Sequence, residues 1–370
     1  TYNGTVMTFD EKKHMETTVP TKYWHKLEDG RIQCDLCPQH CKLKNAQRGI
    51  CFVRACQNEM IVLTTYGRSS GFCIDPIEKK PLYHFLPGTP VLSFGTAGCN
   101  LTCKFCQNWD ISKSREMDTL CDTASPEMIA QAAKENGCSC VAFTYNDPVI
   151  FHEYAIDTAK ACHERGIKTV AVTAGYVCPE PRKEFYAHMD AANVDLKGFT
   201  DSFYKNYCGG HLEPVLDTLV YLKKETNVWF EITTLLIPTL NDSESEIDEM
   251  TKWIMKNLGP DVPLHFTAFH PAWKIENLHP TPPSILFRAR TIAKQNGLHH
   301  VYTGNIQDNT GGSTYCHRCN KKLIGRNGYI LTEWNIIKNG VCKFCETKCE
   351  GVFCEKPGTW GAKRLPARIK

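Results

Sequence analysis

The chain has 370 residues, enough for one large α/β domain with smaller modules beside it. Hydrophobic residues make up 42% of the sequence, which excludes global disorder, and a net charge of +3 gives no reason to expect bulk affinity for nucleic acid or membranes. No apolar run reaches about 18 residues and no signal-peptide core lies near the start, so we expect a cytoplasmic protein. We expect the basic tail, 356–370, to be solvated.

Cysteine is unusually frequent, with 21 residues in the chain. The cysteines lie mainly in three tight groups, and their short spacings are typical of metal ligands in a reducing compartment, not of disulfide partners. We therefore divide the chain into an irregular cysteine-rich module at 1–85, a middle region at 86–310 and a cysteine-rich module with the basic tail at 311–370.

The middle region alternates between short apolar segments and helical patterns. Strands are expected at 91–95, 140–145, 168–173, 193–197, 228–236 and 263–269, and 299–303 is either a further strand or an exit segment. Helices are expected from Ser125 to Gly137, at 150–166, at 212–224, after a capping box formed by Ser243 and Glu246, and at 283–297. This order predicts an α/β fold, a partial (β/α)6 barrel with its active site at the carboxyl ends of the strands.

A cysteine motif follows the first of these strands. Cys99, Cys103 and Cys106 have the spacing Cys-x3-Cys-x2-Cys, and Phe105 precedes the last cysteine. Three thiolates can each bind a different iron of one cubic cluster and leave the fourth iron open, as a catalytic site requires. The alternative is a zinc loop that lacks its fourth ligand.

This motif resembles that of the radical S-adenosylmethionine superfamily, and the resemblance extends to about residue 310. The chain most resembles the branch of the pyruvate formate-lyase activating enzyme, and within it the radical enzyme of the AmmeMemoRadiSam system. The resemblance implies a [4Fe–4S] cluster whose open iron binds S-adenosylmethionine, reductive formation of a 5′-deoxyadenosyl radical, and hydrogen abstraction from a substrate. It also implies an electron donor such as flavodoxin or ferredoxin, and it alone suggests Memo-like and AMMECR1-like partners.

Polar residues at the ends of later strands are candidates to hold the cofactor. Tyr145, Asn146 and Asp147 stand where the family has its GGEP-type motif, with Asp147 in place of the usual Glu, and the alternative is an ordinary turn. At the end of the next strand, Ala174 stands where the family usually has Asn. The remaining candidates to contact the cofactor there are Thr173 and the backbone of Gly175.

Asp195 and Lys197 alternate with apolar neighbours, so both point to one face and match the family's DLK motif; the alternative is an ordinary ion pair. His270 resembles a histidine near the cofactor in activating enzymes, and Ile237 is a candidate to pack on adenine.

The flanking cysteines predict two further metal sites. Cys316, Cys319, Cys342 and Cys345 form two CxxC knuckles around a hairpin-like stretch, as in a zinc ribbon, although iron fits the same geometry. His317, Cys349 and Cys354 are spare candidates. The N-terminal set is Cys34, Cys37, Cys41 and Cys51, and its spacing leaves zinc and an auxiliary iron–sulfur cluster open.

We therefore expect a radical enzyme of unknown substrate. An activase would make a glycyl radical on a protein partner, and the alternative within the class modifies a peptide or small molecule, for example by carbon methylation. An alternative of another class is a non-catalytic electron carrier or zinc-ribbon interaction protein, which the two ends of the chain fit but the long middle region does not.

Overall fold

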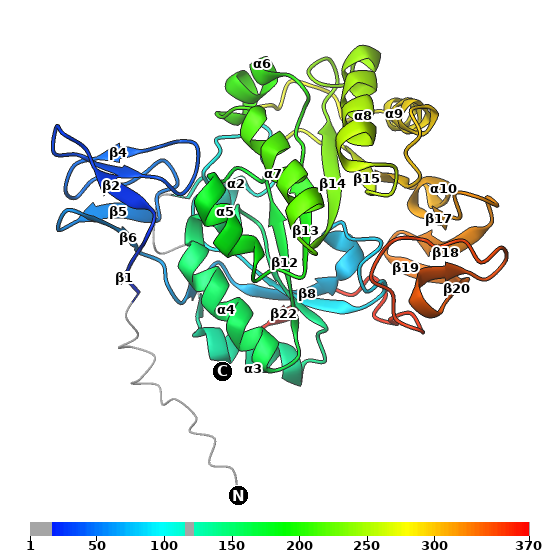
Figure 1. Ribbon diagram of the computed structural model, residues 1–370, viewed down its shortest axis with the longest axis horizontal. Coiled ribbons are helices and arrows are strands. Elements are labelled where there is room, and N and C mark those ends of the chain that lie inside the picture. The colour runs from blue at the N-terminus through cyan, green and yellow to red at the C-terminus, as the bar shows by residue number, and fades with distance from the viewer. Residues whose placement is uncertain (1–16, 115–121, 370) are drawn as a thin grey trace, which may run out of the picture.

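The computed structural model describes residues 17–114 and 122–369 (Figure 1). Its centre is a sheet of nine strands in the order β16-β15-β14-β13-β12-β11-β9-β8-β22. The strands predicted from the sequence are all present, and 299–303 contributes a strand as well. Seven run parallel: β9 (Pro90–Phe94), β11 (Cys140–Phe143), β12 (Lys168–Thr173), β13 (Ala191–Asp195), β14 (Trp229–Leu236), β15 (Leu264–Ala268) and β16 (Val301–Gly304). The α/β partial-barrel fold is confirmed.

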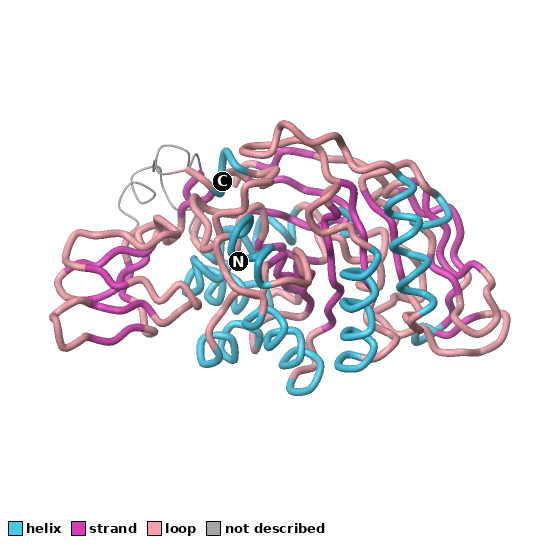
Figure 2. Tube along the Cα trace, turned by 90° about the horizontal axis from the view of Figure 1, so that it is seen from above, coloured by secondary structure: helices cyan, strands magenta, loops and turns pink. Residues whose placement is uncertain are grey.

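Helices lie along the outside of the curved sheet (Figure 2). They are α3 (Pro126–Glu135), α4 (His152–Glu164), α5 (Pro179–Tyr186), α7 (Glu213–Glu225), α8 (Glu244–Leu258) and α9 (Pro283–Gln295), with short turns α2 (Trp109–Ser112), α6 (Asp201–Phe203) and α10 (Asn309–Gly312). The helix α5 was not expected, because its eight residues include two prolines and few apolar positions.

The expected capping box at α8 forms only in part. Ser243 Oγ accepts a hydrogen bond from the Glu246 backbone N–H at 3.2 Å, as the motif requires. The Glu246 carboxylate instead accepts from the Phe199 N–H at 2.6 Å. This bond ties α8 to the segment that follows β13, so a tertiary contact replaces the second half of the local motif.

The edge of the sheet is built from the two ends of the chain. β8 (Phe72–Pro76) pairs antiparallel with β9, and β22 (Leu365–Ala367) pairs antiparallel with β8. This part of the basic tail is therefore paired with the sheet, while its basic residues Lys363, Arg364 and Arg368 are exposed; Lys370 lies outside the described residues. Edge pairing needs only backbone groups, so a segment with exposed side chains such as Leu365 can provide it.

The two cysteine-rich segments lie at opposite ends of the molecule (Figure 1). The N-terminal one contains β1 (Val19–Pro20), β2 (Trp24–Lys26), β3 (Ile32–Cys34), β4 (Lys42–Leu43), β5 (Arg54–Gln57), β6 (Met60–Leu63) and β7 (Arg68–Ser69), which pairs with β10 (Asp122–Thr123). The sequence suggested an irregular region here, because strands of two to four residues are too short to show alternation. The domain boundary near residue 85 stays a prediction.

The C-terminal segment contains the expected hairpin, formed by β18 (Lys322–Asn327) and β19 (Ile330–Trp334). It also contains β17 (Thr314–Tyr315), β20 (Ile336–Ile337) and β21 (Val341–Cys342). Among the helices of the described residues, none combines the length and apolar character needed to cross a bilayer.

Candidate functional site

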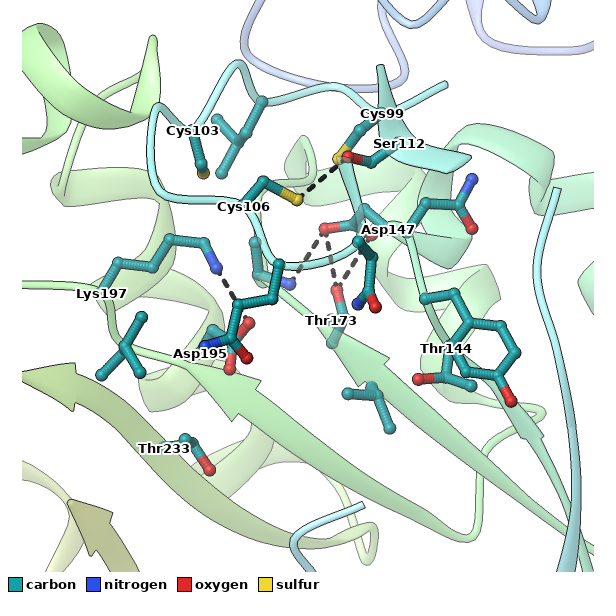
Figure 3. Close-up of a pocket in the computed structure, with 18 of the residues that line it drawn as sticks. Cys99, Cys103, Cys106, Ser112, Thr144, Asp147, Thr173, Asp195, Lys197 and Thr233 are labelled. Atoms are coloured by element: carbon teal, nitrogen blue, oxygen red, sulfur yellow. Dashed lines mark hydrogen bonds and ion pairs between the residues drawn. The ribbon is translucent and has the colours of Figure 1, made fainter. Parts of the chain in front are cut away.

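A pocket opens at the carboxyl ends of the parallel strands (Figure 3). The loop between β9 and α2 supplies Cys99, Cys103 and Cys106 to its wall. Strands that are far apart in the sequence meet here because parallel pairing brings their carboxyl ends to one edge. The predicted residues that line the pocket are Cys99, Cys103, Phe105, Cys106, Tyr145, Asn146, Asp147, Thr173, Asp195 and Lys197.

Two of the three thiols face groups that were not expected from the motif. Cys106 Sγ lies 3.0 Å from Ser112 Oγ on α2. A hydrogen bond with the Cys208 thiol lowers the pKa of Cys103 to about 6, with Lys197 and Lys113 acting in the same direction against the effect of burial. All the cysteines that the structure describes are free thiols.

Asn146 fixes the start of the cysteine loop. Its side-chain N–H groups donate to the carbonyl oxygens of Thr96 and Gly98, each at 2.8 Å, and its Oδ1 accepts from Thr96 N–H at 3.3 Å. The side chain is 7% exposed, and its polar atoms are occupied by these bonds. Asn146 therefore holds the backbone immediately before Cys99.

A second brace holds the middle of the loop. The Thr102 and Lys104 N–H groups donate to the carbonyl oxygens of Cys208 and Tyr207, both at 2.8 Å. These acceptors belong to a π-helical turn, Tyr204–Cys208. Gly209 follows the turn, and a Cβ at this position would lie 2.0 Å from Thr102 Oγ1, so the approach requires glycine.

The Asp147 carboxylate is saturated by its own chain. It accepts from the Val149 N–H at 3.0 Å, the Ala174 N–H at 2.9 Å and the Thr173 hydroxyl at 3.0 Å. It thereby caps the 3-10 turn Pro148–Phe151 and joins the ends of β11 and β12. Burial raises the pKa of Asp147, although these hydrogen bonds favour its ionised form.

Asp195 and Lys197 form an ion pair at the pocket wall, with Lys197 Nζ 2.9 Å from Asp195 Oδ2 (Figure 3). Their side chains are 34% and 16% exposed. Burial alone would lower the pKa of Lys197, but Asp195 and the nearby thiols of Cys103 and Cys208 raise it well above its ordinary value. The ammonium thus stays charged beside the cysteine loop.

Two aromatic residues complete the wall. Tyr145 has a φ of 71°, a left-handed conformation that is rare for a bulky residue, and its ring faces Lys80 Nζ at 5.6 Å. The Phe105 ring packs on Phe203 with centroids 5.8 Å apart. Backbone strain of this kind collects at functional sites, which is consistent with a site at the end of β11.

Other predicted residues lie outside the lining. His270 is exposed beyond the end of β15, and Ile237 is buried. Gly175 has a φ of 65° and packs against Val194 and Thr218. None of the three is among the described residues that line the pocket.

The pocket also contains polar residues that the sequence did not reveal. They are Ser112, Lys113, Thr233, Thr267 and Asn305. Thr233 and Thr267 belong to strands that were predicted, so inward alternation along those strands was a usable signal. Cys208 carried no such signal, because it lies about a hundred residues beyond the motif.

The C-terminal thiols converge on one point. The sulfur atoms of Cys316, Cys319, Cys342 and Cys345 all lie within 4.8 Å of one another. The Cys316–Cys345 and Cys319–Cys342 pairs are 3.6 and 3.7 Å apart. The spare candidates do not join them: Cys349 faces His84 and His300, His317 stacks on His299, and Cys354 is exposed.

The N-terminal cysteines also come together. Cys34, Cys37, Cys41 and Cys51 line one small cavity with Gly49 and Arg54. The Arg54 side chain is 2% exposed and pairs with Glu153 at 2.5 Å.

Comparisons with known proteins identify the family of the chain and several relatives. Residues 94–254 match the model of the Radical SAM superfamily. An uncharacterised protein of Methanocaldococcus jannaschii, MJ0808, is 37% identical over 332 residues, covering 90% of this chain and 98% of that protein. The pyruvate formate-lyase-activating enzyme of Clostridium pasteurianum is 28% identical over 47% of this chain and 72% of that enzyme. A radical SAM methyltransferase structure from Sphaerobacter thermophilus covers 80% of both chains at 13% identity, with a TM-score of 0.48.

Proposed function

Because the chain belongs to the radical SAM superfamily, we propose that Cys99, Cys103 and Cys106 bind three irons of one [4Fe–4S] cluster and leave the fourth open for S-adenosylmethionine. When bound, these groups would supply the chemistry, the one-electron reductive cleavage of S-adenosylmethionine to methionine and a 5′-deoxyadenosyl radical that could take hydrogen from a substrate. The observation that carries the proposal is that the three thiols line the same pocket as the polar residues at the ends of β11, β12 and β13.

The residues of the pocket fit such a cofactor. Thr233 Oγ1 is buried in the wall and has no hydrogen-bond partner among the described residues, so a bound polar group would satisfy it. Lys197 has three N–H donors and gives one to Asp195, which leaves donors for a carboxylate. We propose that Lys197 binds the methionine carboxylate and that Asp195 holds the Lys197 ammonium in place.

Asn146 and Asp147 act mainly by positioning. Their polar atoms are occupied by the cysteine loop and by the end of β12, so they fix the thiols and the pocket floor. The ends of β11 and β12, which these bonds hold together, then present a rigid surface to the cofactor. The resemblance implies a different role, in which the acid and the backbone carbonyls of the GGEP-type motif, here at Asn146 and Asp147, receive the methionine amino group.

We favour a protein as the substrate, as for an activating enzyme. Trp109 is 45% exposed and stacks on Trp273 with ring centroids 5.0 Å apart. The Lys274 N–H donates to the Lys104 carbonyl at 2.9 Å, so this pair lies against the cysteine loop. Exposed aromatic residues are enriched where proteins bind each other. Relatives of this chain are named as pyruvate formate-lyase and 4-hydroxyphenylacetate decarboxylase activating enzymes.

The reducing electron would come from a flavodoxin or ferredoxin. Memo-like and AMMECR1-like partners rest on the resemblance alone and stay predictions. For the C-terminal cysteines we propose a tetrahedral metal site, with zinc as the first candidate: a Zn–S bond of about 2.3 Å gives sulfur separations of about 3.8 Å, close to those of this set, although iron fits the same geometry. The N-terminal set is proposed to hold a metal or a cluster.

The test is the cleavage of S-adenosylmethionine. Protein reconstituted with iron and sulfide under anaerobic conditions should form 5′-deoxyadenosine when reduced with dithionite. Cys103→Ala should abolish this product and leave the zinc content unchanged. A wild-type protein with an intact cluster but no cleavage would contradict the proposal, and loss of zinc and fold in the variant would make the central cysteines structural.

A further inference from the structure

We propose that Cys34, Cys37, Cys41 and Cys51 bind a second [4Fe–4S] cluster, and not zinc, directly beside the cysteine loop of the barrel. The placement relative to the barrel cluster rests on the proposed function; the identity of the N-terminal group does not.

The first argument is the separation of the thiols. A tetrahedral zinc ion holds its four sulfur atoms about 3.8 Å apart, whereas each thiolate of a cubic cluster binds a different iron and lies farther from the others. Among the described residues, the C-terminal set is the only group of three or more cysteines whose sulfur atoms all lie within 4.8 Å of one another. Neither the N-terminal four nor Cys99, Cys103 and Cys106 form a group that close, so both sets lack the tight spacing of the C-terminal one.

The second argument is the apolar surroundings of the thiols. The four cysteines enclose a cavity whose other lining is mostly apolar, from Leu36, Leu43, Ile50 and Ile150. Gly49 lies on this cavity, and a Cβ there would be 3.5 Å from Cys41 Sγ and 3.7 Å from Cys51 Sγ. Gly49 thus lies directly beside both sulfur atoms.

The third argument is charge and hydrogen bonding. An iron–sulfur cluster with four thiolates is an anion, and it is stabilised by hydrogen bonds to sulfur and by a nearby cation. Arg54 lines the cavity, and its guanidinium pairs with the Glu153 carboxylate of α4. Backbone N–H groups of Leu36, Gln39 and Val53 point at Cys34, Cys37 and Cys51.

Contacts between backbones place this site next to the barrel loop. A Cβ on Gly98 would lie 1.9 Å from the Cys51 carbonyl oxygen, so the residue before Cys99 touches Cys51 itself. Gln39, between Cys37 and Cys41, donates to the carbonyl oxygens of Asn100 and Gly209 at 2.9 and 2.7 Å. The middle and the C-terminal end of the N-terminal set therefore contact residues adjacent to Cys99.

The test begins with a protein that lacks the barrel ligands, Cys99→Ala/Cys103→Ala/Cys106→Ala. It should retain about four iron and four sulfide per chain and give a paramagnetic signal on reduction. Iron-free protein, or zinc in excess of the C-terminal site, would overturn the proposal whatever happens to S-adenosylmethionine cleavage.

The complementary variant is Cys37→Ser/Cys51→Ser, which should lose about half of the wild-type cluster iron. Cys56→Ser is the matched control, because this buried cysteine of the same segment does not line the cavity and should keep all the iron. Equal iron in wild type and the double variant would overturn the assignment.

The placement has its own readout. In fully reduced wild type, the two neighbouring centres should couple magnetically, so the electron paramagnetic resonance spectrum should differ from the sum of the spectra of the two variants. A spectrum equal to that sum would overturn the placement beside Cys99.

Discussion

Asn146 donates a hydrogen bond to the carbonyl oxygen of Gly98 at 2.8 Å, and so links the end of β11 to the residue before Cys99. The contact joins two parts of the chain that are 48 residues apart. Together with the bonds from the loop to the turn Tyr204–Cys208, this contact holds the loop that carries the three thiols in one conformation.

Removing this link should lower cluster occupancy. Asn146→Ala leaves the buried Thr96 and Gly98 carbonyls unpaired, which should cost about 2 kcal/mol of stability. We expect less iron per chain after reconstitution than in wild type. Asn136→Ala is the control, since Asn136 bonds only the local Ala132 carbonyl at the end of α3. Equal iron contents in both variants would show that Asn146 does not position the loop.

Lys197 should govern affinity for S-adenosylmethionine. Lys197→Met removes a charge-assisted bond to the methionine carboxylate, and the dissociation constant should rise at least ~10-fold. Isothermal titration of the reconstituted protein measures this. Lys205→Met is the control, because Lys205 also pairs with an aspartate, Asp201, but on the surface. Unchanged affinity in Lys197→Met would remove Lys197 from the binding site.

The C-terminal site should lose its metal independently of the barrel. Cys342→Ser should remove about one zinc per chain and destabilise the β18–β19 hairpin, because a structural zinc contributes folding energy. Cys354→Ser should keep the metal, since Cys354 is exposed and outside the group. Metal analysis that finds iron in this site would contradict zinc and favour a rubredoxin-like centre.

Two buried histidines should make stability depend on pH. Burial lowers the pKa of His84 to about 4, and burial also lowers the pKa of His300 well below its ordinary value. The unfolded chain protonates histidine near pH 6.5, so it binds more protons than the folded chain below that pH. Their contribution to stability is present above about pH 6.5 and is lost as the pH falls toward 4.

The free energy of unfolding should therefore fall by about 2 kcal/mol between pH 7.5 and 5.5. Urea denaturation of His84→Gln/His300→Gln should show a smaller fall over the same interval. His279→Gln, at an exposed position, should keep the wild-type slope. A wild-type stability that does not change over this interval would contradict the burial of neutral imidazoles.

Much of the barrel could be predicted because its helices and strands are long enough for their apolar residues to show the spacing typical of each. β12 has the predicted bounds, and the polar residues at its end and at the ends of β11 and β13 line one pocket. Local spacing also sufficed for the three cysteines of the loop. These features depend on neighbours in the sequence.

The remainder depends on contacts between distant segments. The carboxylate of Asp147 is used by Thr173 and Ala174, and nothing near Asp147 in the sequence indicates this. Cys208 approaches Cys103 through a π-helical turn, a rare geometry without a sequence pattern. The pairing of β22 with β8 brings together strands almost 300 residues apart in the sequence, mainly through their backbone groups.

The most direct test is electron paramagnetic resonance of the reduced barrel cluster before and after adding S-adenosylmethionine, in the Cys37→Ser/Cys51→Ser variant so that one cluster is observed. Direct binding to an open iron should change the g values of the signal, and Cys103→Ala in the same background should give no signal. An iron–sulfur signal that S-adenosylmethionine leaves unchanged would contradict the proposal that Cys99, Cys103 and Cys106 leave one iron open.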